Sequence, residues 1–195
     1  MLGLRRRRDD AAGRVSVDTQ RSIYLQGARV DLTSRTGVTV RVPGAELARC
    51  VQRALRASGA PEPASVAVVL TDDEELAELN REHMGIDGPT DVLSFPMLPP
   101  DAFPRRQMAL RPRSTRQTNR ARTHIGDIAI SVERAIEQAE QGRGGQTGDV
   151  RWSAADELRL LVTHGTLHLC GWDHAEPADE TAMRALETRL IASRA

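Results

Sequence analysis

Cysteine, lysine and long apolar segments are rare or missing in this sequence of 195 residues. Its only cysteines, Cys50 and Cys170, are too few for a disulfide framework, so we expect a reducing, cytoplasmic setting. The basic run Arg5 to Arg8 has no apolar stretch behind it and does not resemble a secretory signal. No segment approaches the length of a transmembrane helix, so we do not expect a membrane protein.

The 27 basic residues are all arginines and equal the 27 acidic residues, so net charge alone indicates no class of partner. One arginine cluster is the run from Arg5 to Arg8. The other is a proline-rich segment, residues 97–123, which contains Arg105, Arg106, Arg111, Arg113, Arg116, Arg120 and Arg122. Clustered arginine attracts phosphate and stacks on unpaired bases, so both segments are candidate RNA contacts. A solvated segment that binds nothing explains the same composition.

We predict one folded domain over residues 28–195, with a disordered extension at residues 1–27 and a mobile insertion at about residues 97–123. Apolar, β-branched runs predict strands near residues 29–32, 65–70, 91–96 and 126–132. Helical periodicity and capping residues predict helices near residues 43–58, 72–84, 133–141, 153–169 and 177–193. The expected fold is therefore α+β, a small mixed, mostly parallel sheet packed with about five helices.

Three of the 5 histidines lie within the short segment from His164 to His174. His164 and His168 are four residues apart, so on a helix their imidazoles share one face, one turn apart. Gly171 allows the chain to leave the helix, after which His174 can return as a third ligand. Three protein ligands leave a fourth position open, as in catalytic zinc sites. The sequence therefore predicts a hydrolase with one zinc ion at the end of a central helix.

Two structural alternatives remain for this cluster. One is a set of ordinary core histidines, which the spacing disfavours. The other is a structural zinc site, which usually has four protein ligands and often thiolates. Cys170 is adjacent, but on a continuing helix it lies on a different face from His168. Asp173 is the candidate for orienting a ligating imidazole, and capping the turn is the alternative role for it.

The histidine spacing equals that of the metzincin proteases, H-E-x-x-H-x-x-G-x-x-H. Those enzymes need a glutamate after the first histidine as general base, and here that position is Gly165. The segment HGTLHLCGWDH instead resembles the H-G-x-L-H-L-x-G-[YW]-D-H signature of the YbeY family of bacterial endoribonucleases. PTDVLSFP at residues 89–96 and IGDIAIS at residues 125–131 are similar to two further motifs of that family.

The resemblance covers about residues 29–193 and implies a compact domain with one zinc ion. It also implies single-strand-specific RNA cleavage in 16S rRNA 3′ end processing and ribosome quality control, with the small ribosomal subunit or its assembly factors as partners. One position departs from the family, which commonly has an arginine, proposed to contact phosphate, where this chain has Met84. Arg81 and His83 are the candidate substitutes.

The expected reaction is zinc-assisted hydrolysis of a phosphodiester. No residue stands out as a general base; Asp91 and Ser94 are candidates for lining the cleft, and Arg81 for contacting the phosphate. Two other functions stay open. One is a ribosome-assembly factor that binds RNA and uses zinc only for its shape. The other is a metallohydrolase of a non-RNA substrate, which a narrow apolar pocket without a basic rim would favour.

Overall fold

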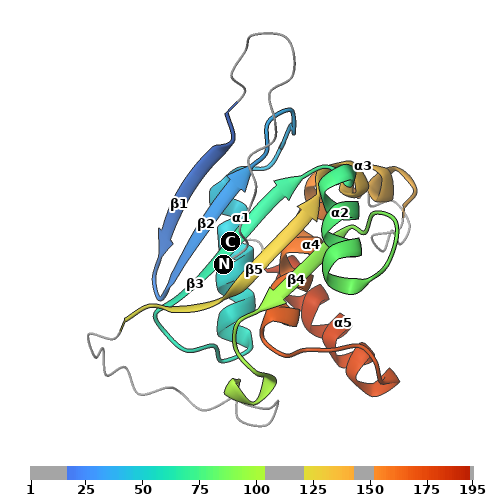
Figure 1. The fold of residues 1–195 in the computed structure, drawn as a ribbon. Coiled ribbons are helices and arrows are strands. Elements are labelled where there is room, and N and C mark those ends of the chain that lie inside the picture. The colour runs from blue at the N-terminus through green and yellow to red at the C-terminus, as the bar shows by residue number, and fades with distance from the viewer. Residues whose placement is uncertain (1–16, 104–120, 143–151, 194–195) are drawn as a thin grey trace.

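The computed structural model describes residues 17–103, 121–142 and 152–193. Figure 1 shows its strands as one twisted sheet with helices on both faces. The elements in chain order are β1 (Thr19–Leu25), β2 (Ala28–Ser34), α1 (Gly44–Ala57), β3 (Ala64–Thr71), α2 (Asp73–Met84), β4 (Val92–Pro96), the 3-10 helix η1 (Pro100–Ala102), β5 (Thr123–Ser131), α3 (Val132–Glu140), α4 (Ala154–Leu169) and α5 (Pro177–Ala192).

The sheet has the strand order β1-β2-β3-β5-β4. Strands β2, β3 and β5 run parallel in its centre, whereas β1 and β4 pair antiparallel at its two edges. A mixed sheet packed with five α-helices, within the described residues, confirms the α+β prediction. The pairings are evenly divided between parallel and antiparallel, however, rather than mostly parallel. At one edge, β1 runs antiparallel to β2 because a turn of only two residues joins them. So short a connection can link antiparallel strands but not parallel ones.

The sheet buries a different set of side chains on each face. Val68, Ile128 and Ile130 belong to the main core, where the sheet packs against α1 and α4. Ala129 points to the opposite face and packs with Leu76 of α2. Helix α4 also contacts α1, α3 and α5, which makes it the central helix of the fold. Any side chain at its C-terminal end is therefore positioned by several elements at once.

Local capping explains where the two helices nearest the functional motifs begin and end. Asp72 caps α2 by accepting a hydrogen bond from the backbone N–H of Glu75, and Gly85 ends the helix with φ of 69°. Ser153 and Asp156 form a reciprocal capping box at the start of α4. These boundaries confirm those predicted from the sequence.

The prediction of a disordered extension over residues 1–27 is wrong for residues 19–25. They form β1, which pairs along its whole length with β2 after a turn at Gly27, where φ is 77°. The predicted mobile insertion is also too long, because Phe103 is buried at 5% exposure and β5 already begins at Thr123. The rest of both predictions falls on residues 1–16 and 104–120, outside the described residues.

Within the described ranges, no helix combines the length and the hydropathy that crossing a bilayer requires.

Candidate metal centre

The last two turns of α4 carry two histidines side by side. His164 and His168 lie one turn apart on the same face, and their Nε2 atoms are 3.0 Å from each other. The rings meet edge to face, with centroids 4.5 Å apart. The (i, i+4) spacing produces this pair, as predicted from the sequence.

A tight turn after α4 brings the third histidine back to the pair. Gly171 has φ of 78°, and its N–H donates to the carbonyl of His168 at 3.0 Å, while Trp172 N–H donates to the carbonyl of Leu167 at 3.1 Å. The ring centroid of His174 then lies 5.8 Å from that of His164 and 5.0 Å from that of His168. One ring nitrogen from each histidine lies within 4.8 Å of the other two, so the three could hold a metal ion.

The chemistry of this cluster suits a metal. Burial lowers the pKa of His168, and the neighbouring His164 and His174 lower it further. The ring is therefore neutral near pH 7, and neutral imidazole is the form that ligates. Two nitrogens at tetrahedral positions on one zinc ion would be about 3.3–3.4 Å apart, close to the 3.0 Å between the Nε2 atoms of His164 and His168. Cys170 does not belong to the cluster, since its side chain is buried in the main hydrophobic core. Burial also raises the pKa of its thiol to about 12.

Glu187 of α5 holds one of these imidazoles, a contact that the sequence predictions missed. Its Oε1 lies 2.7 Å from Nδ1 of His164, which leaves Nε2 of that ring directed at the other histidines. A carboxylate in this position fixes the tautomer and orientation of a ligating histidine. The available signal was an acidic residue on the face of α5 that also carries the buried Met183 and Leu186.

Asp173, the sequence candidate for orienting an imidazole, has another contact. Its Oδ1 accepts a hydrogen bond from the backbone N–H of His174 at 2.7 Å, so it caps the turn. Its negative charge also acts on His168 and raises the pKa of that ring slightly against the larger lowering effects. The contact with a ring nitrogen is made by Glu187.

Gly165 explains why α4 can lie so close to β4 and β5. A Cβ at this position would be 2.9 Å from Cγ2 of Ile128, 3.0 Å from Oγ of Ser94 and 3.2 Å from Cγ2 of Val92. The side chain of a glutamate would not fit there, which gives the sequence argument against a protease a steric basis. Oγ of Ser94 donates to the carbonyl of Gly165 at 3.1 Å, linking the strand directly to the helix.

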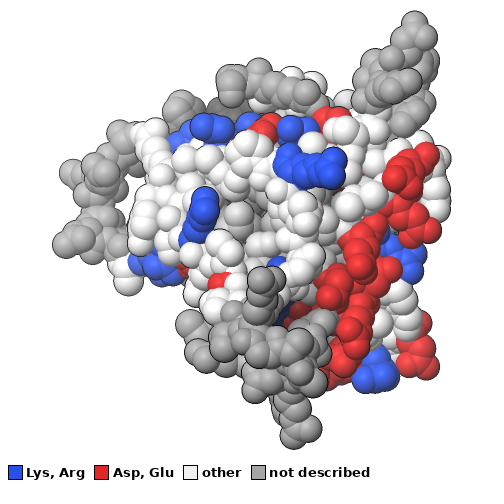
Figure 2. Space-filling model, turned by 90° about the horizontal axis from the view of Figure 1, so that it is seen from above, with Lys and Arg blue, Asp and Glu red and all other residues white. Residues whose placement is uncertain are grey.

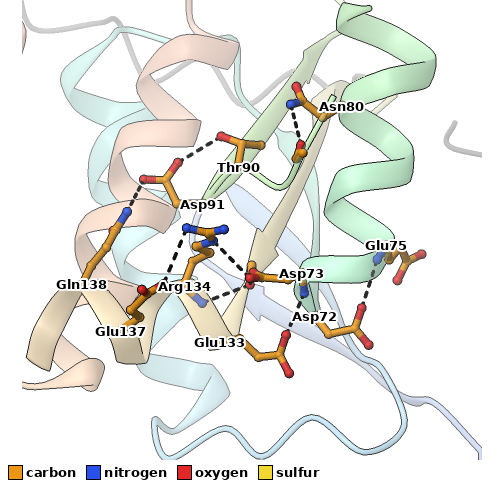
Figure 3. Close-up of polar contacts among 12 residues, drawn as sticks. Asp72, Asp73, Glu75, Asn80, Thr90, Asp91, Glu133, Arg134, Glu137 and Gln138 are labelled. Atoms are coloured by element: carbon orange, nitrogen blue, oxygen red, sulfur yellow. Dashed lines mark hydrogen bonds and ion pairs between the residues drawn. The ribbon is translucent and has the colours of Figure 1, made fainter. Parts of the chain in front are cut away.

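Two of the three residues proposed from the sequence to line the cleft or contact the phosphate reach the site. Asp91 and Ser94 line a cavity of about 530 Å³ together with all three histidines of the cluster. Asp91 is held firmly, because its carboxylate accepts hydrogen bonds from Gln138 Nε2 and from the backbone N–H of Val92, each at 2.9 Å. Figure 3 shows Asp91 between Gln138 and Thr90.

The third candidate, Arg81, is exposed in the last turn of α2 and does not line this cavity, whereas Met84 does. His83 makes an edge contact with the ring of Phe95, with centroids 5.0 Å apart. Neither candidate substitute for the family arginine therefore lies in the cavity wall.

A sequence model of the family described as Endoribonuclease YbeY matches residues 34–194. The chain belongs to the YbeY family. The resemblance inferred from the three sequence motifs is confirmed, and the described residues before position 34, β1 among them, lie outside the matched region.

Several curated members of the YbeY family are similar over most of their length, each named Endoribonuclease YbeY. The protein of Salinispora tropica is 40% identical over 142 residues, covering 73% of this chain and 82% of that protein. The protein of Symbiobacterium thermophilum is 40% identical over 147 residues, covering 74% and 81%. That of Thermobifida fusca is 38% identical over 164 residues, covering 84% and 92%. A solution structure of a Thermotoga maritima protein, 23% identical, aligns with a TM-score of 0.47 over 84% of this chain and 86% of that one.

Proposed function

We propose that this member of the YbeY family is a zinc-dependent, single-strand-specific endoribonuclease of the cytoplasm. Its role would be rRNA maturation, at the 16S rRNA 3′ end, and ribosome quality control, with the small ribosomal subunit or its assembly factors as partners. The observation that carries the proposal is the three-histidine cluster at a cavity of about 530 Å³. The names of the relatives, all endoribonucleases, supply the reaction class.

The metal ligands in this proposal are His164, His168 and His174. Three imidazoles leave one position open, and the neutral state of His168 at pH 7 means that no proton has to leave that ring before it ligates. Glu187 would hold His164 in the ligating orientation through its hydrogen bond to Nδ1. Zinc bound there supplies Lewis-acid stabilisation of the charge that develops on a phosphodiester during hydrolysis.

The residues around the cluster would orient the RNA rather than exchange protons with it. Oγ of Ser94 already donates to the carbonyl of Gly165, and the carboxylate of Asp91 is occupied by Gln138 and Val92. Among the described residues that line the cavity of about 530 Å³ at the histidine cluster, none is an arginine. Stabilisation of the phosphate charge would therefore depend chiefly on the metal.

The charge distribution restricts where RNA can approach. Figure 2 shows a band of acidic side chains across the face seen from above, at the end of the sheet where α2 and α3 begin. The first turns of these helices contain Asp73, Glu74 and Glu133. Figure 3 shows Asp73 facing the guanidinium of Arg134. This face repels a phosphate backbone, so the RNA would reach the histidines from another side.

The proposal is tested by zinc analysis and RNA cleavage on wild type, His168→Ala and a control, His124→Gln, whose side chain lies outside the cluster and the cavity. Wild type purified without chelator should contain one zinc per chain and cleave a single-stranded rRNA precursor. His168→Ala should lose both properties while its far-ultraviolet circular dichroism stays native, and His124→Gln should keep both.

Each negative result in this experiment would contradict a different part of the proposal. Absence of metal in the wild type would contradict the metal centre. Stoichiometric zinc without cleavage of any rRNA precursor would favour an assembly factor that binds RNA without cutting it. Loss of native circular dichroism in His168→Ala would make the zinc structural.

A further inference from the structure

A second, smaller cavity lies on the other side of the histidine cluster. Its volume is about 260 Å³, and it shares Asp91, His164 and His174 with the larger cavity. It lies between α4 and α5, and its apolar wall is formed by Leu160, Leu161 and Met183. His164 and His174 therefore border both cavities, and a chain-like ligand held at the cluster can extend into both.

The lining of the small cavity excludes a phosphate group. Four carboxylates contribute to its wall, those of Asp91, Glu157, Glu180 and Glu187, against a single guanidinium. That guanidinium, of Arg184, is already paired with Glu180, at 2.7 Å between Nη2 and Oε1. The excess of negative charge repels an anion. A flat, uncharged group with apolar faces and hydrogen-bond donors on its edge matches the lining better, and nucleobases have this character.

One carboxylate oxygen, Oε2 of Glu187, is available to accept a hydrogen bond from the edge of a base. Glu187 is buried, at 8% exposure, and its Oε1 is engaged by His164. Within the described part of the chain its Oε2 has no hydrogen bond, and it is not among the fully buried polar atoms that lack one, so solvent reaches it. Glu187 lines the small cavity. The bond to His164 fixes the direction of this acceptor. An acceptor with a fixed direction distinguishes donor edges from acceptor edges.

We propose that the small cavity is a nucleobase subsite, next to the scissile phosphate, that selects bases with an exocyclic amino group. This inference rests on the proposed function. Oε2 of Glu187 accepts a hydrogen bond from the amino group of adenine, cytosine or guanine, while Leu160 and Met183 contact the base. At the mouth, the guanidinium of Arg184, exposed at 74%, stacks on the outer face of the ring. Uracil would place a carbonyl oxygen against the carboxylate instead.

The test compares single-stranded RNAs that differ only in the amino group. Oligoadenylate is compared with the same length of purine riboside, which lacks the amino group, and oligocytidylate with oligouridylate. A hydrogen bond to a charged group corresponds to about 10- to 100-fold in kcat/KM. The wild type should therefore favour the amino-bearing member of each pair by that factor.

Glu187→Gln should reverse the preference rather than only weaken activity. The glutamine Oε1 can still accept from Nδ1–H of His164, while its amide N–H₂ replaces the Oε2 acceptor. The ratio of oligocytidylate to oligouridylate cleavage should then fall to 1 or below. Glu176→Gln, at the exposed N-cap of the same helix, where the side chain makes no capping hydrogen bond, is the matched control and should keep the wild-type ratio.

The possible outcomes separate the subsite from the proposed function. Equal cleavage of both members of each pair by the wild type would overturn the subsite and leave the nuclease intact. A Glu187→Gln variant that is slower on all four RNAs by one factor, with its preference unchanged, would also overturn it, because Glu187 would then act through His164 alone. No cleavage of any RNA by the wild type would overturn the proposed function and the subsite together. If Glu187→Gln does not fold, the wild-type ratios still decide.

Discussion

The position of Gly165 determines how closely α4 packs on the sheet, and Gly165→Ala tests this with one methyl group. The added Cβ would lie 2.9 Å from Cγ2 of Ile128 and 3.0 Å from Oγ of Ser94. Overpacking a core in this way costs about 1–3 kcal/mol, and the higher helix propensity of alanine offsets about 0.8–1.0 kcal/mol. The middle of these ranges gives a net loss of about 1 kcal/mol in the free energy of unfolding.

Urea denaturation followed by circular dichroism measures this loss. With an m-value of about 2 kcal/mol/M, the midpoint of Gly165→Ala should fall by about 0.5 M. Ala185→Gly, at an exposed interior position of α5, is the control for helix propensity alone and should cost about 1 kcal/mol. Gly165→Glu should lose more than either, because a buried carboxylate without a partner costs about 3–5 kcal/mol in addition. If the urea midpoint of Gly165→Ala is at or above that of wild type, the claim that α4 packs too closely on the sheet to admit a Cβ at position 165 is refuted.

Three further predictions concern the surroundings of the cluster. Glu187→Ala should weaken zinc binding about 10- to 100-fold in competition with a chromophoric chelator, and unchanged affinity would mean that Glu187 does not orient His164. Asp173→Ala should leave zinc affinity within a few-fold, since its contact is with the backbone; a loss as large as that of Glu187→Ala would contradict this. Burial raises the pKa of Cys170 from 9.0 to about 12, so only the unfolded thiol ionises between these values. Ionisation of this thiol in the unfolded chain should lower stability by about 1.4 kcal/mol per pH unit above pH 9. Cys170→Ala should remove that contribution and leave the one from Cys50, whose buried thiol also has a raised pKa.

The parts of the fold that the sequence predicted well depend on local signals. The start of α4 follows from the capping box of Ser153 and Asp156, and the histidine pair follows from helical spacing. The return of the third histidine follows from a glycine that adopts a left-handed conformation. Each of these features is decided within one or two turns of chain, so no knowledge of the tertiary structure was needed.

The features that the sequence did not predict depend on pairing between distant segments. Strand β1 has a mostly exposed, polar sequence and is a strand because β2 offers it hydrogen bonds along its full length. The contact between Glu187 and His164 joins α5 to α4 over 23 positions of sequence. Arg81 looked close to the missing arginine position along the chain, but the side chain that lines the cavity belongs to Met84. Residues that are close in sequence at the end of a helix can point in different directions, so only some of them reach the site.

Zinc K-edge X-ray absorption of the purified protein tests the central claim most directly, because it reports the atoms bound to the metal. The predicted spectrum has three imidazole nitrogens and one oxygen at about 2.0–2.1 Å, with one nitrogen lost in His174→Ala. A sulfur ligand at about 2.3 Å, or a coordination shell without imidazole, would contradict a centre formed by His164, His168 and His174.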